Sequence, residues 1–450
     1  MAGAAPPLRE LLAAAAHCVA QVHAGRSLSV VLPGVAANLR PGVQALVFET
    51  LRRAGTARAL VRLLASRLPP PPVAALLEVA LTLLLEGKAY AAPTVVDQAV
   101  QALGRLRASA LRGFVNACLR RYLRESEVLR AAARATPEGR WNHPAWWVQR
   151  LQADHPRHWA EVLQADDMPA PLVLRVNRRR TTRAQVQARL AQQGCNAEPI
   201  GADGLVLAQP MPVDRLPGWN EGWVSVQDGA AQLAAPLLLG AGLRPGARVL
   251  DACAAPGGKS AHLLEQADVE LWALDADAQR LQRLHETLER LRLPAPGSTV
   301  QVRCADAADP ADWWDGRPFD AIVLDAPCTA SGIVRRHPDV RWLRRPDDVE
   351  RLAAHQRRLL QALWPLLAPG GRLLMVTCSV FRAEGEETVA AWARHQADAR
   401  VLPAPGHLLP WGRLADPNPA AETMLAAHAI SENARRGMDG FFYALLAKAG

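Results

Sequence analysis

The stretch VLDACAAPGGKSAHLL, from Val249 to Leu264, decides the fold of the C-terminal half of this 450-residue chain. An apolar run typical of a strand ends in a tight loop of small residues, and helical periodicity resumes directly after that loop. A glycine-rich turn between a strand and a helix usually binds a phosphate or a nucleotide, because exposed N–H groups at the start of the helix attract anions and hydrogen-bond acceptors. The stretch therefore predicts a strand, a ligand-binding loop and a helix.

The two common nucleotide-binding patterns do not fit this loop. Gly257 to Ser260 reads like the end of a phosphate loop, but that motif needs a glycine where Cys253 stands, with four residues between it and Gly258. The dinucleotide pattern G-x-G-x-x-G is also missing. We therefore expect a different kind of nucleotide ligand.

Strands and helices alternate downstream of Gly242, in segments such as VELWALDA, DAQRLQRLHETLERLR and FDAIVLDA. Near-continuous apolar strands between amphipathic helices predict a parallel sheet that is covered on both faces. We expect this doubly wound α/β domain over residues 231–450.

The N-terminal part has a different pattern. Apolar residues recur at helical spacing from Leu8 to about Glu127, which predicts an all-α domain over residues 1–140. The segment RATPEGRWNHPAWW, residues 134–147, has the proline, glycine and polar content of a linker. A small α/β module is expected over residues 141–230, where LVLRVNRRRTT predicts a strand ending in a basic loop and RAQVQARLAQQG predicts a helix. The protein is therefore expected to be multidomain.

The composition favours a polyanionic partner. The formal net charge is +9 and the isoelectric point is near 9.7, so nucleic acid is the first candidate. Seven scattered cysteines without a C-x-x-C pair argue against a disulfide framework and against a zinc site. The longest uncharged run near the middle, Gly229 to Leu243, contains Pro236 and is too short to span a bilayer. We expect reduced thiols, no metal, no membrane segment and a cytoplasmic location.

Carboxylates follow three strands of the predicted sheet. Asp275 ends VELWALD, Asp306 ends QVRCAD and Asp325 ends FDAIVLD. Ligands of doubly wound sheets bind at the carboxyl ends of the strands, and the position of Asp275 suits a carboxylate that accepts hydrogen bonds from both ribose hydroxyls. Each aspartate alone could simply cap the following helix, but three of them together with the loop favour a binding site.

Two cysteines fall at the same edge of the sheet, Cys328 in DAPCTASG and Cys378 in VTCSV. A thiolate there is suited to attack an electron-poor ring carbon such as carbon 6 of cytosine, after which carbon 5 is nucleophilic and takes a methyl group from a sulfonium donor. Loss of the carbon 5 proton and of the thiol then restores aromaticity. The spacing alone does not choose between the two thiols. Four further cysteines are expected in the hydrophobic core: Cys18, Cys118, Cys195 and Cys304.

Four stretches resemble the RNA 5-methylcytosine methyltransferases, specifically the bacterial RsmB family that modifies small-subunit ribosomal RNA: LDACAAPGGKS, DAPCTASGIVRRHPDVRWLRR, VTCSV and DGFFYALLAK. The resemblance implies an S-adenosylmethionine site, with Asp275 on the ribose, Asp306 near the adenine and Asp325 between cofactor and target base. It also implies that Cys378 is the nucleophile and that Cys328 assists product release. The loop residues that it places around the methionine end of the cofactor are Cys253, Ala254, Ala255, Pro256, Gly257, Gly258 and Lys259.

The resemblance covers nearly the whole chain. FETLRR and GFVNACLRR resemble the family's NusB-like helical domain, and LVLRVNRRRTTR with GWVSVQDGAAQLAA resembles its pre-catalytic RNA-binding segment. The C-terminal domain is accordingly expected to be a Rossmann-like methyltransferase domain. The chain departs from the family's pattern at Ser260-Ala261, where paired threonines are usual, and in the segment 415–437, which is longer and less familiar.

Two arginine clusters are candidates for contacts with the RNA backbone, although charge runs are often only solvated faces. The first cluster consists of Arg175, Arg178, Arg179, Arg180 and Arg183, and the second of Arg335, Arg336, Arg341, Arg344 and Arg345. From these, Arg178 to Arg180, Arg335 and Arg336 are predicted to bind RNA. His337 is added as a catalytic or phosphate contact, with a loop-ordering hydrogen bond as the alternative.

The predicted activity is S-adenosylmethionine-dependent methylation of carbon 5 of a cytidine in 16S ribosomal RNA, through a covalent cysteine adduct. The substrate is expected to be 16S RNA or a small-subunit assembly intermediate, and the enzyme a monomer that acts in ribosome biogenesis. Two alternatives stay open: a transfer RNA cytosine-5 methyltransferase, and a catalytically silent RNA-binding or antitermination-type factor. The presence of both Cys328 and Cys378 speaks against the silent factor.

Overall fold

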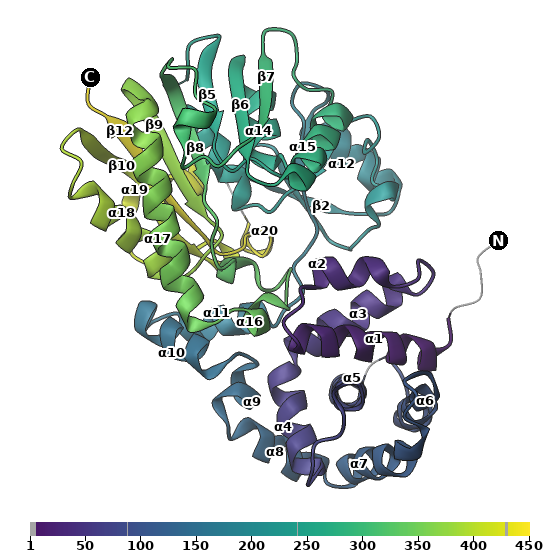
Figure 1. Ribbon diagram of the computed structural model, residues 1–450. Helices are drawn as coiled ribbons and strands as arrows, with labels where there is room; N and C mark the ends of the chain where they lie inside the picture. Colours follow the sequence, from purple (N-terminus) through teal and green to yellow (C-terminus); the bar gives the residue numbers. More distant parts are fainter. Residues whose placement is uncertain (1–5, 88, 241, 428–430) are drawn as a thin grey trace. The chain divides into compact units, whose positions relative to one another are not determined.

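The computed structural model describes residues 6–87, 89–240, 242–427 and 431–450. The chain divides into two compact units. The helical unit comprises Met1–Pro169 and Val334–Pro346, and the sheet unit comprises Ala170–Ile333 and Asp347–Gly450. Figure 1 shows both units with their helices and strands labelled.

A large hydrophobic core of the helical unit is built around α5 (Pro71–Glu86). This helix carries apolar residues on most of its sides, and Leu76, Leu77 and Leu81 are fully buried. Amphipathic helices surround it and turn their apolar faces toward it, which is the expected arrangement for one apolar helix among amphipathic ones. The other helices before residue 134 are α1 (Leu8–His23), α2 (Leu28–Val31), α3 (Arg40–Arg52), α4 (Ala54–Leu64), α6 (Ala92–Arg105), α7 (Arg112–Arg124) and α8 (Ser126–Arg134).

Most of residues 134–147 are helical, with short breaks at 135–136 and 142–144, so the expectation of a linker there is wrong. They contain α9 (Pro137–Trp141) and the start of α10 (Ala145–Asp154), and α11 (Trp159–Asp166) follows. The polar and proline residues that indicated a linker are helix-start residues: the Thr136 hydroxyl accepts the Gly139 N–H, and a proline at the first helical position needs no N–H partner. Trp147 is fully buried and anchors α10.

The segment Val334–Pro346 lies between two strands of the sheet unit in sequence but folds with the helical unit. Asp339 accepts hydrogen bonds from the Ser27 hydroxyl at 3.1 Å and the Leu28 N–H at 3.0 Å, and so caps the start of α2. The segment's short helix α16 (Val340–Leu343) carries Trp342, whose indole N–H donates to the Leu51 carbonyl at 2.8 Å. Trp342 and Leu343 both pack against the helical core.

The sheet unit begins with a four-stranded antiparallel sheet in the order β2-β3-β1-β4. The helix α12 (Arg183–Gln192) covers it, and the start of this helix is stabilised by a reciprocal capping box between Thr182 and Gln185. Val186 and Leu190 on this helix pack against the alternating apolar residues of the strands. The strands are β1 (Val173–Val176), β2 (Ala197–Ile200), β3 (Gly204–Leu207) and β4 (Val224–Val226).

A larger sheet of eight strands follows, in the order β11-β10-β12-β9-β8-β5-β6-β7. The five strands from β9 to β7 are parallel, and β12 joins them antiparallel to β9. The strands are β5 (Ala247–Asp251), β6 (Val269–Asp275), β7 (Thr299–Cys304), β8 (Phe319–Asp325), β9 (Leu367–Thr377), β10 (Ala399–Leu409), β11 (Arg413–Leu414) and β12 (Phe441–Lys448).

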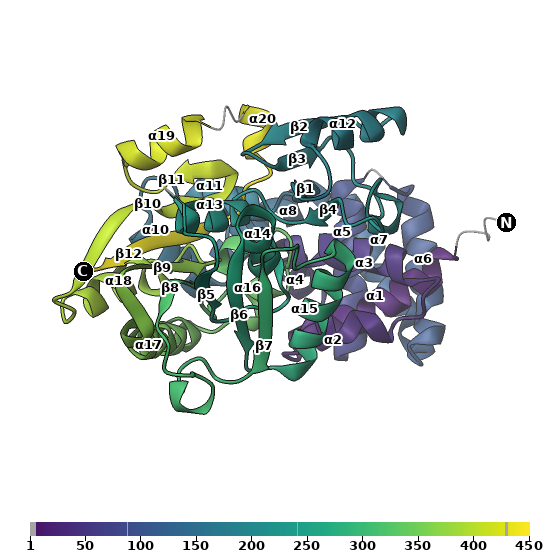
Figure 2. The same ribbon diagram turned by 90° about the horizontal axis from the view of Figure 1, so that it is seen from above.

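Helices cover both faces of this sheet, as the near-continuous apolar strands predict. Along β5, Val249 belongs to the core on one face and Leu250 to the core on the other. The first core includes residues of α13 (Ala234–Leu239), α14 (Gly258–Gln266) and α15 (Ala278–Leu291), and the second includes residues of α17 (Pro346–Leu363) and α18 (Glu386–Ala393). Figure 2 shows α14 and α17 on opposite sides of the strands. The architecture is therefore Rossmann-like.

The structure also describes Cys304 and most of the segment 415–437. Cys304 is exposed, not buried in the core as expected, because it ends the edge strand β7. The unfamiliar segment 415–437 contains α19 (Pro419–Ala427) and α20 (Glu432–Arg435), while residues 428–430 lie outside the described residues.

Candidate active site

The strand order places a site beside β5. The chain runs from β5 outward through β6 to β7 on one side and then crosses back to β8 on the other side of β5, so the strand order reverses at β5. Ligands of open α/β sheets bind at such a switch point. The predicted site residues that follow β5, β6, β8 and β9 therefore belong to one edge of one sheet.

The loop after β5 is shaped by glycine and by backbone hydrogen bonds. Gly257 has a left-handed φ of 101°, and a side chain added there would lie 3.2 Å from Leu284. The Ala254 N–H donates to the Leu274 carbonyl at 2.7 Å, which ties the loop to the end of β6. Small residues are required here because the loop and α15 approach each other closely, and α14 then begins at Gly258.

Lys259 forms an ion pair with Asp325, with 2.6 Å between Nζ and Oδ2. Burial of this ammonium opposes its charge, but the neighbouring carboxylate and its hydrogen bond outweigh burial and raise the pKa of Lys259 above its usual value. A lysine held by a carboxylate is not free to neutralise a phosphate. The structure thus adds a second argument against a phosphate loop, besides Cys253.

Asp251 ends β5 directly before this loop and was not singled out from the sequence. It is fully buried, and the Ser260 hydroxyl donates to it at 2.6 Å. Burial raises the pKa of Asp251 to about 7. Ser260 thus supplies the hydroxyl hydrogen bond that a threonine would make, so the departure from the family's threonines keeps this contact. Its position at a strand end was the available signal for Asp251.

Asp275 is a buried carboxylate at the end of β6, 4% exposed. It accepts the Ala255 N–H at 3.2 Å and the Asp277 N–H at 3.0 Å, and it lies 3.4 Å from Arg280. The residue that caps α15 is Asp277, which accepts two N–H groups of that helix. The alternative that Asp275 merely caps a helix is therefore excluded.

Asp306 lies beyond the end of β7 and is partly exposed. One of its oxygens accepts the Ala308 N–H at 2.9 Å, and the other lies 2.5 Å from the Arg358 guanidinium. Asp306 is thus available to a ligand only in competition with Arg358.

The two candidate thiols are in contact with each other. Cys328 and Cys378 come from the loops that follow the adjacent strands β8 and β9, and their sulfur atoms are 3.4 Å apart. The hydrogen bond with Cys378, and then burial, raise the pKa of Cys328 well above its usual value. Either sulfur can be the donor in this contact, and the raised pKa favours the protonated form of the Cys328 thiol. Burial also raises the pKa of Cys253, which keeps that thiol protonated and unreactive.

Glu384 joins the two cysteine loops and was missed from the sequence. It is fully buried, accepts the Thr329 N–H at 2.7 Å and the Thr329 hydroxyl, and accepts the Ser379 hydroxyl at 2.7 Å. Thr329 follows Cys328 and Ser379 follows Cys378. One carboxylate thus holds the residues next to both thiols. No spacing rule signals such a residue, because only the fold brings the two loops together.

The first arginine cluster is divided by the fold. Arg175 is buried, and its Nε and Nη2 donate hydrogen bonds at 2.8 Å to the two carboxylate oxygens of Glu265, so it forms an internal ion pair of the sheet unit. Arg178, Arg179 and Arg180 are exposed. Arg178 is 3.2 Å from Asp203 and Arg179 is 2.7 Å from Asp268, and the exposed heads of these pairs remain candidates for RNA contacts.

The second cluster lies in the segment that folds with the helical unit. Arg335 and Arg341 are buried, at 1% and 0% exposure, and the Arg335 carbonyl accepts a hydrogen bond from Arg52 at 3.0 Å. A buried guanidinium does not reach an RNA phosphate, so Arg335 does not have the exposure that its predicted role requires. Arg336 is partly exposed and His337 is exposed, and the prediction for these two residues stays open.

Within the described ranges, no three His, Cys, Asp or Glu side chains gather as metal ligands would. No helix in that same part of the chain is long and apolar enough to cross a membrane.

Family models match three parts of the chain. The model described as 16S rRNA methyltransferase RsmB/F matches residues 241–447. The model for the ferredoxin-like domain of RsmF/B-like methyltransferases matches residues 143–214, and the NusB family model matches residues 13–124.

Full-length relatives agree with these matches. The ribosomal RNA small subunit methyltransferase B of Xanthomonas campestris pv. campestris is 42% identical over 99% of this chain and 98% of that protein. The protein of the same name from Vibrio cholerae serotype O1 is 40% identical over 97% of each chain. The crystal structure of PH0851 has a TM-score of 0.74 at 22% identity and covers 98% of this chain and 99% of that one, so the fold is shared.

Proposed function

The chain belongs to the RsmB/F family of 16S rRNA methyltransferases, and on this basis we propose that it methylates carbon 5 of a cytidine in 16S ribosomal RNA with S-adenosylmethionine as the methyl donor. The observation that carries the proposal is the pair of thiols, Cys328 and Cys378, with sulfur atoms 3.4 Å apart at the carboxyl ends of adjacent parallel strands. Two thiols at a ligand-binding edge suit an attack on a pyrimidine ring followed by release of the product.

The residues beside β5 fit this cofactor better than a nucleoside triphosphate. Asp275 offers a carboxylate for ribose hydroxyls at the strand next to the loop, and Lys259 is already neutralised by Asp325. The loop from Cys253 to Lys259 would hold the methionine end, with Asp306 near the adenine. When bound, the cofactor supplies an electrophilic methyl group on a sulfonium.

Cys378 acts as the nucleophile in this proposal. Its thiolate forms a bond to carbon 6 of the cytosine, and the electron pair of the ring double bond moves toward carbon 5, which takes the methyl group. This choice follows the resemblance of VTCSV to the family's nucleophile motif, and the raised pKa of Cys328 suits a partner thiol that stays protonated. The hydrogen bond to Cys378 stabilises the thiolate that must attack.

Release of the product reverses the first bond. The proton on carbon 5 passes to the Cys328 sulfur while Cys328 gives its own proton to the departing Cys378 sulfur. The electron pair left on carbon 5 re-forms the ring double bond, and the bond between carbon 6 and the Cys378 sulfur breaks. We assign assistance in this step to Cys328, which lies within reach of the departing sulfur. Asp325 is three residues before Cys328 and is 34% exposed, so its carboxylate can orient both Lys259 and the base.

The substrate is tested by bisulfite sequencing of ribosomal and transfer RNA from a strain that lacks the gene, with and without the restored gene. We expect one cytidine of 16S RNA to lose its protection in the deletion strain and to regain it on complementation. Loss of a transfer RNA site would favour the transfer RNA alternative. No change in either RNA would leave the silent RNA-binding factor. With ribosomal RNA as the substrate, we place the enzyme in the cytoplasm, acting on 16S RNA or on an assembly intermediate.

A further inference from the structure

The helical unit contains a cavity of about 510 Å³ whose wall is rich in arginine. Arg53, Arg130, Arg134 and Arg140 line it together with Trp141, and all belong to the helical unit. The residues come from α8, α9 and the start of α4, with others from α5 and α11. The function proposed above gives this cavity no role.

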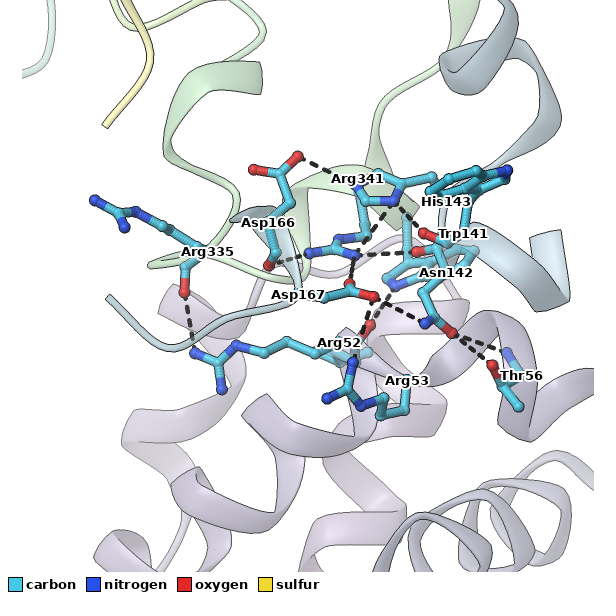
Figure 3. Close-up of polar contacts among 12 residues, drawn as sticks. Arg52, Arg53, Thr56, Trp141, Asn142, His143, Asp166, Asp167, Arg335 and Arg341 are labelled. Atoms are coloured by element: carbon cyan, nitrogen blue, oxygen red, sulfur yellow. Dashed lines mark hydrogen bonds and ion pairs between the residues drawn. The ribbon is translucent and has the colours of Figure 1, made fainter. Parts of the chain in front are cut away.

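The acidic residues of the wall are already paired. Arg53 forms ion pairs with two of them, Glu86 at 3.1 Å and Asp167 at 3.4 Å. The other oxygen of Asp167 lies 2.6 Å from the buried Arg341. Figure 3 shows the contacts of Asp167 with Arg53 and Arg341, and the Arg341 guanidinium also donates to the carbonyls of Asp166 and Asn142. The two carboxylates of the wall are therefore neutralised by Arg53 and Arg341.

The other three arginines of the wall have no carboxylate that neutralises them within the described part of the chain. Among the described residues, no carboxylate forms an ion pair with Arg130, Arg134 or Arg140. Arg130 donates to the Leu85 carbonyl at 2.8 Å, but its Nε is buried and has no hydrogen-bond partner among those residues. Three guanidinium groups around one cavity without a counter-charge attract an anion with several oxygens, and phosphate fits the fork of an arginine.

An aromatic ring stands beside these guanidinium groups. The Arg140 guanidinium lies 5.2 Å from the centre of the Trp141 ring, and Trp159 packs edge-on against the same ring at 4.9 Å. Trp141 is therefore fixed in place but only partly buried. A phosphate site next to a fixed aromatic ring matches a nucleotide of single-stranded RNA, whose base stacks while its phosphate binds arginine.

We propose that this cavity binds a nucleotide of the RNA substrate away from the methylated base, with its phosphate on Arg130, Arg134 and Arg140 and its base against Trp141. The inference rests on the proposed function only in taking RNA as the substrate. The site adds affinity for RNA and takes no part in the chemistry, so its loss raises the KM for RNA and leaves kcat and cofactor binding unchanged.

The test compares two double variants of the full-length protein that remove the same charge. Arg134→Ala with Arg140→Ala removes two exposed residues of the cavity, and Arg112→Ala with Arg124→Ala removes two exposed arginines of α7 outside it. Fluorescence anisotropy measures binding of a 16S RNA fragment, without added cofactor, over a range of salt concentrations.

We expect the cavity variant to bind RNA about tenfold more weakly and to flatten the slope of log K against log salt by about 1.4, since each contact with single-stranded RNA contributes about 0.7. The α7 variant should stay within about twofold of wild type. Equal losses in both variants would overturn the proposal, because they would show a general effect of charge. A variant with lysine at 134 and 140 should recover most of the affinity, and this excludes misfolding as the cause.

Binding and methylation are measured separately, so the two proposals fail separately. RNA binding that depends on the cavity, in a protein that methylates no RNA, would reject the proposed function and keep the site. Methylation with an unchanged KM in the cavity variant would reject the site and keep the function. Displacement of bound RNA by polyglutamate at equal charge concentration would identify an acidic peptide as the ligand and overturn the RNA assignment.

Discussion

The sulfur atoms of Cys328 and Cys378 lie 3.4 Å apart although 50 positions separate these residues in the sequence. Two neighbouring parallel strands, β8 and β9, end at the same edge and bring the two thiols together. Glu384 connects the two loops, because its carboxylate accepts hydrogen bonds from Thr329 and from Ser379. The positions of both thiols thus depend on one buried carboxylate.

Replacement of the two thiols should separate their roles. Cys378→Ala cannot form the adduct at carbon 6, so methylation should fall by more than about 10³-fold while cofactor binding survives. Cys328→Ala should still form the adduct but release it slowly. Denaturing gels of Cys328→Ala with RNA and S-adenosylmethionine should then show a covalent protein–RNA band that wild type lacks. A band in Cys378→Ala instead would reverse the roles, and methylation without either thiol would reject covalent catalysis.

Loss of the Glu384 carboxylate should loosen the pair of thiols. Glu384→Gln replaces one acceptor oxygen by an amide that faces the hydroxyls of Thr329 and Ser379, so both loops lose their common partner. We expect diamide, an oxidant of thiol pairs, to form the Cys328–Cys378 disulfide about tenfold more slowly, with methylation falling at least as much. The exposed Glu387→Gln is the matched control. An unchanged oxidation rate in Glu384→Gln would show that Glu384 does not position the thiols.

The ligand of the loop after β5 should be S-adenosylmethionine and not ATP. Calorimetry on the wild-type protein should detect the first and no binding of the second, because Lys259 is engaged by Asp325. Asp275→Ala should weaken S-adenosylmethionine about 10- to 100-fold, the loss expected for hydrogen bonds to a charged group. Tight binding of ATP alone would end this assignment.

The exposed arginines before α12 should contribute to RNA binding through phosphate contacts. Replacing Arg178, Arg179 and Arg180 by alanine should flatten the salt dependence of RNA affinity by about 2 in log–log slope, if each makes one contact with single-stranded RNA. Cofactor affinity, measured on the same variant, should not change. An unchanged slope would identify these residues as a solvated face.

The buried Asp251 should make stability depend on pH. Burial raises its pKa from 3.8 to about 7 in the folded protein, so between these values the folded state binds more protons than the unfolded chain. Its contribution to stability is fully present below the unfolded pKa and is lost as the pH rises through about 7. Asp251→Asn does not ionise, so its free energy of unfolding in urea should fall less than that of wild type between pH 5 and pH 8. Parallel pH profiles would show that Asp251 is not protonated in the folded protein.

Much of the fold could be predicted because its signals are local. Continuous apolar strands such as 247–251 mark a sheet covered on both faces, and Val249 and Leu250 do face opposite cores. The Rossmann-like class, the helical N-terminal part and the family are confirmed. The strand β2, with the sequence AEPI, has no apolar run and contains a proline, and β4 has only three residues, so neither gives a strand signal. Residues 134–147 misled because helix-start residues and linker residues have the same composition.

Some residues of the candidate site could also be predicted from local signals, and others could not. Asp275 and the two cysteines stand at strand ends and could be picked out by that position. Glu384 acts through loops that meet only in the folded protein, so no sequence spacing announces it. Burial of a charged residue is equally hard to predict from the sequence. Arg335 belongs to a basic run, which is usually exposed, yet it is buried in the folded protein.

The return of Val334–Pro346 to the helical unit has a consequence for synthesis of the chain. A nascent chain folds from its N-terminus as it leaves the ribosome, and at about 5–20 residues per second the stretch from Ala170 to Ile333 takes roughly 10–30 s to make. During that time the core that Trp342 and Leu343 complete has no such side chains to pack against it. The first unit to emerge therefore cannot finish folding until much of the second unit has been made, because its last piece leaves the ribosome only after Cys328.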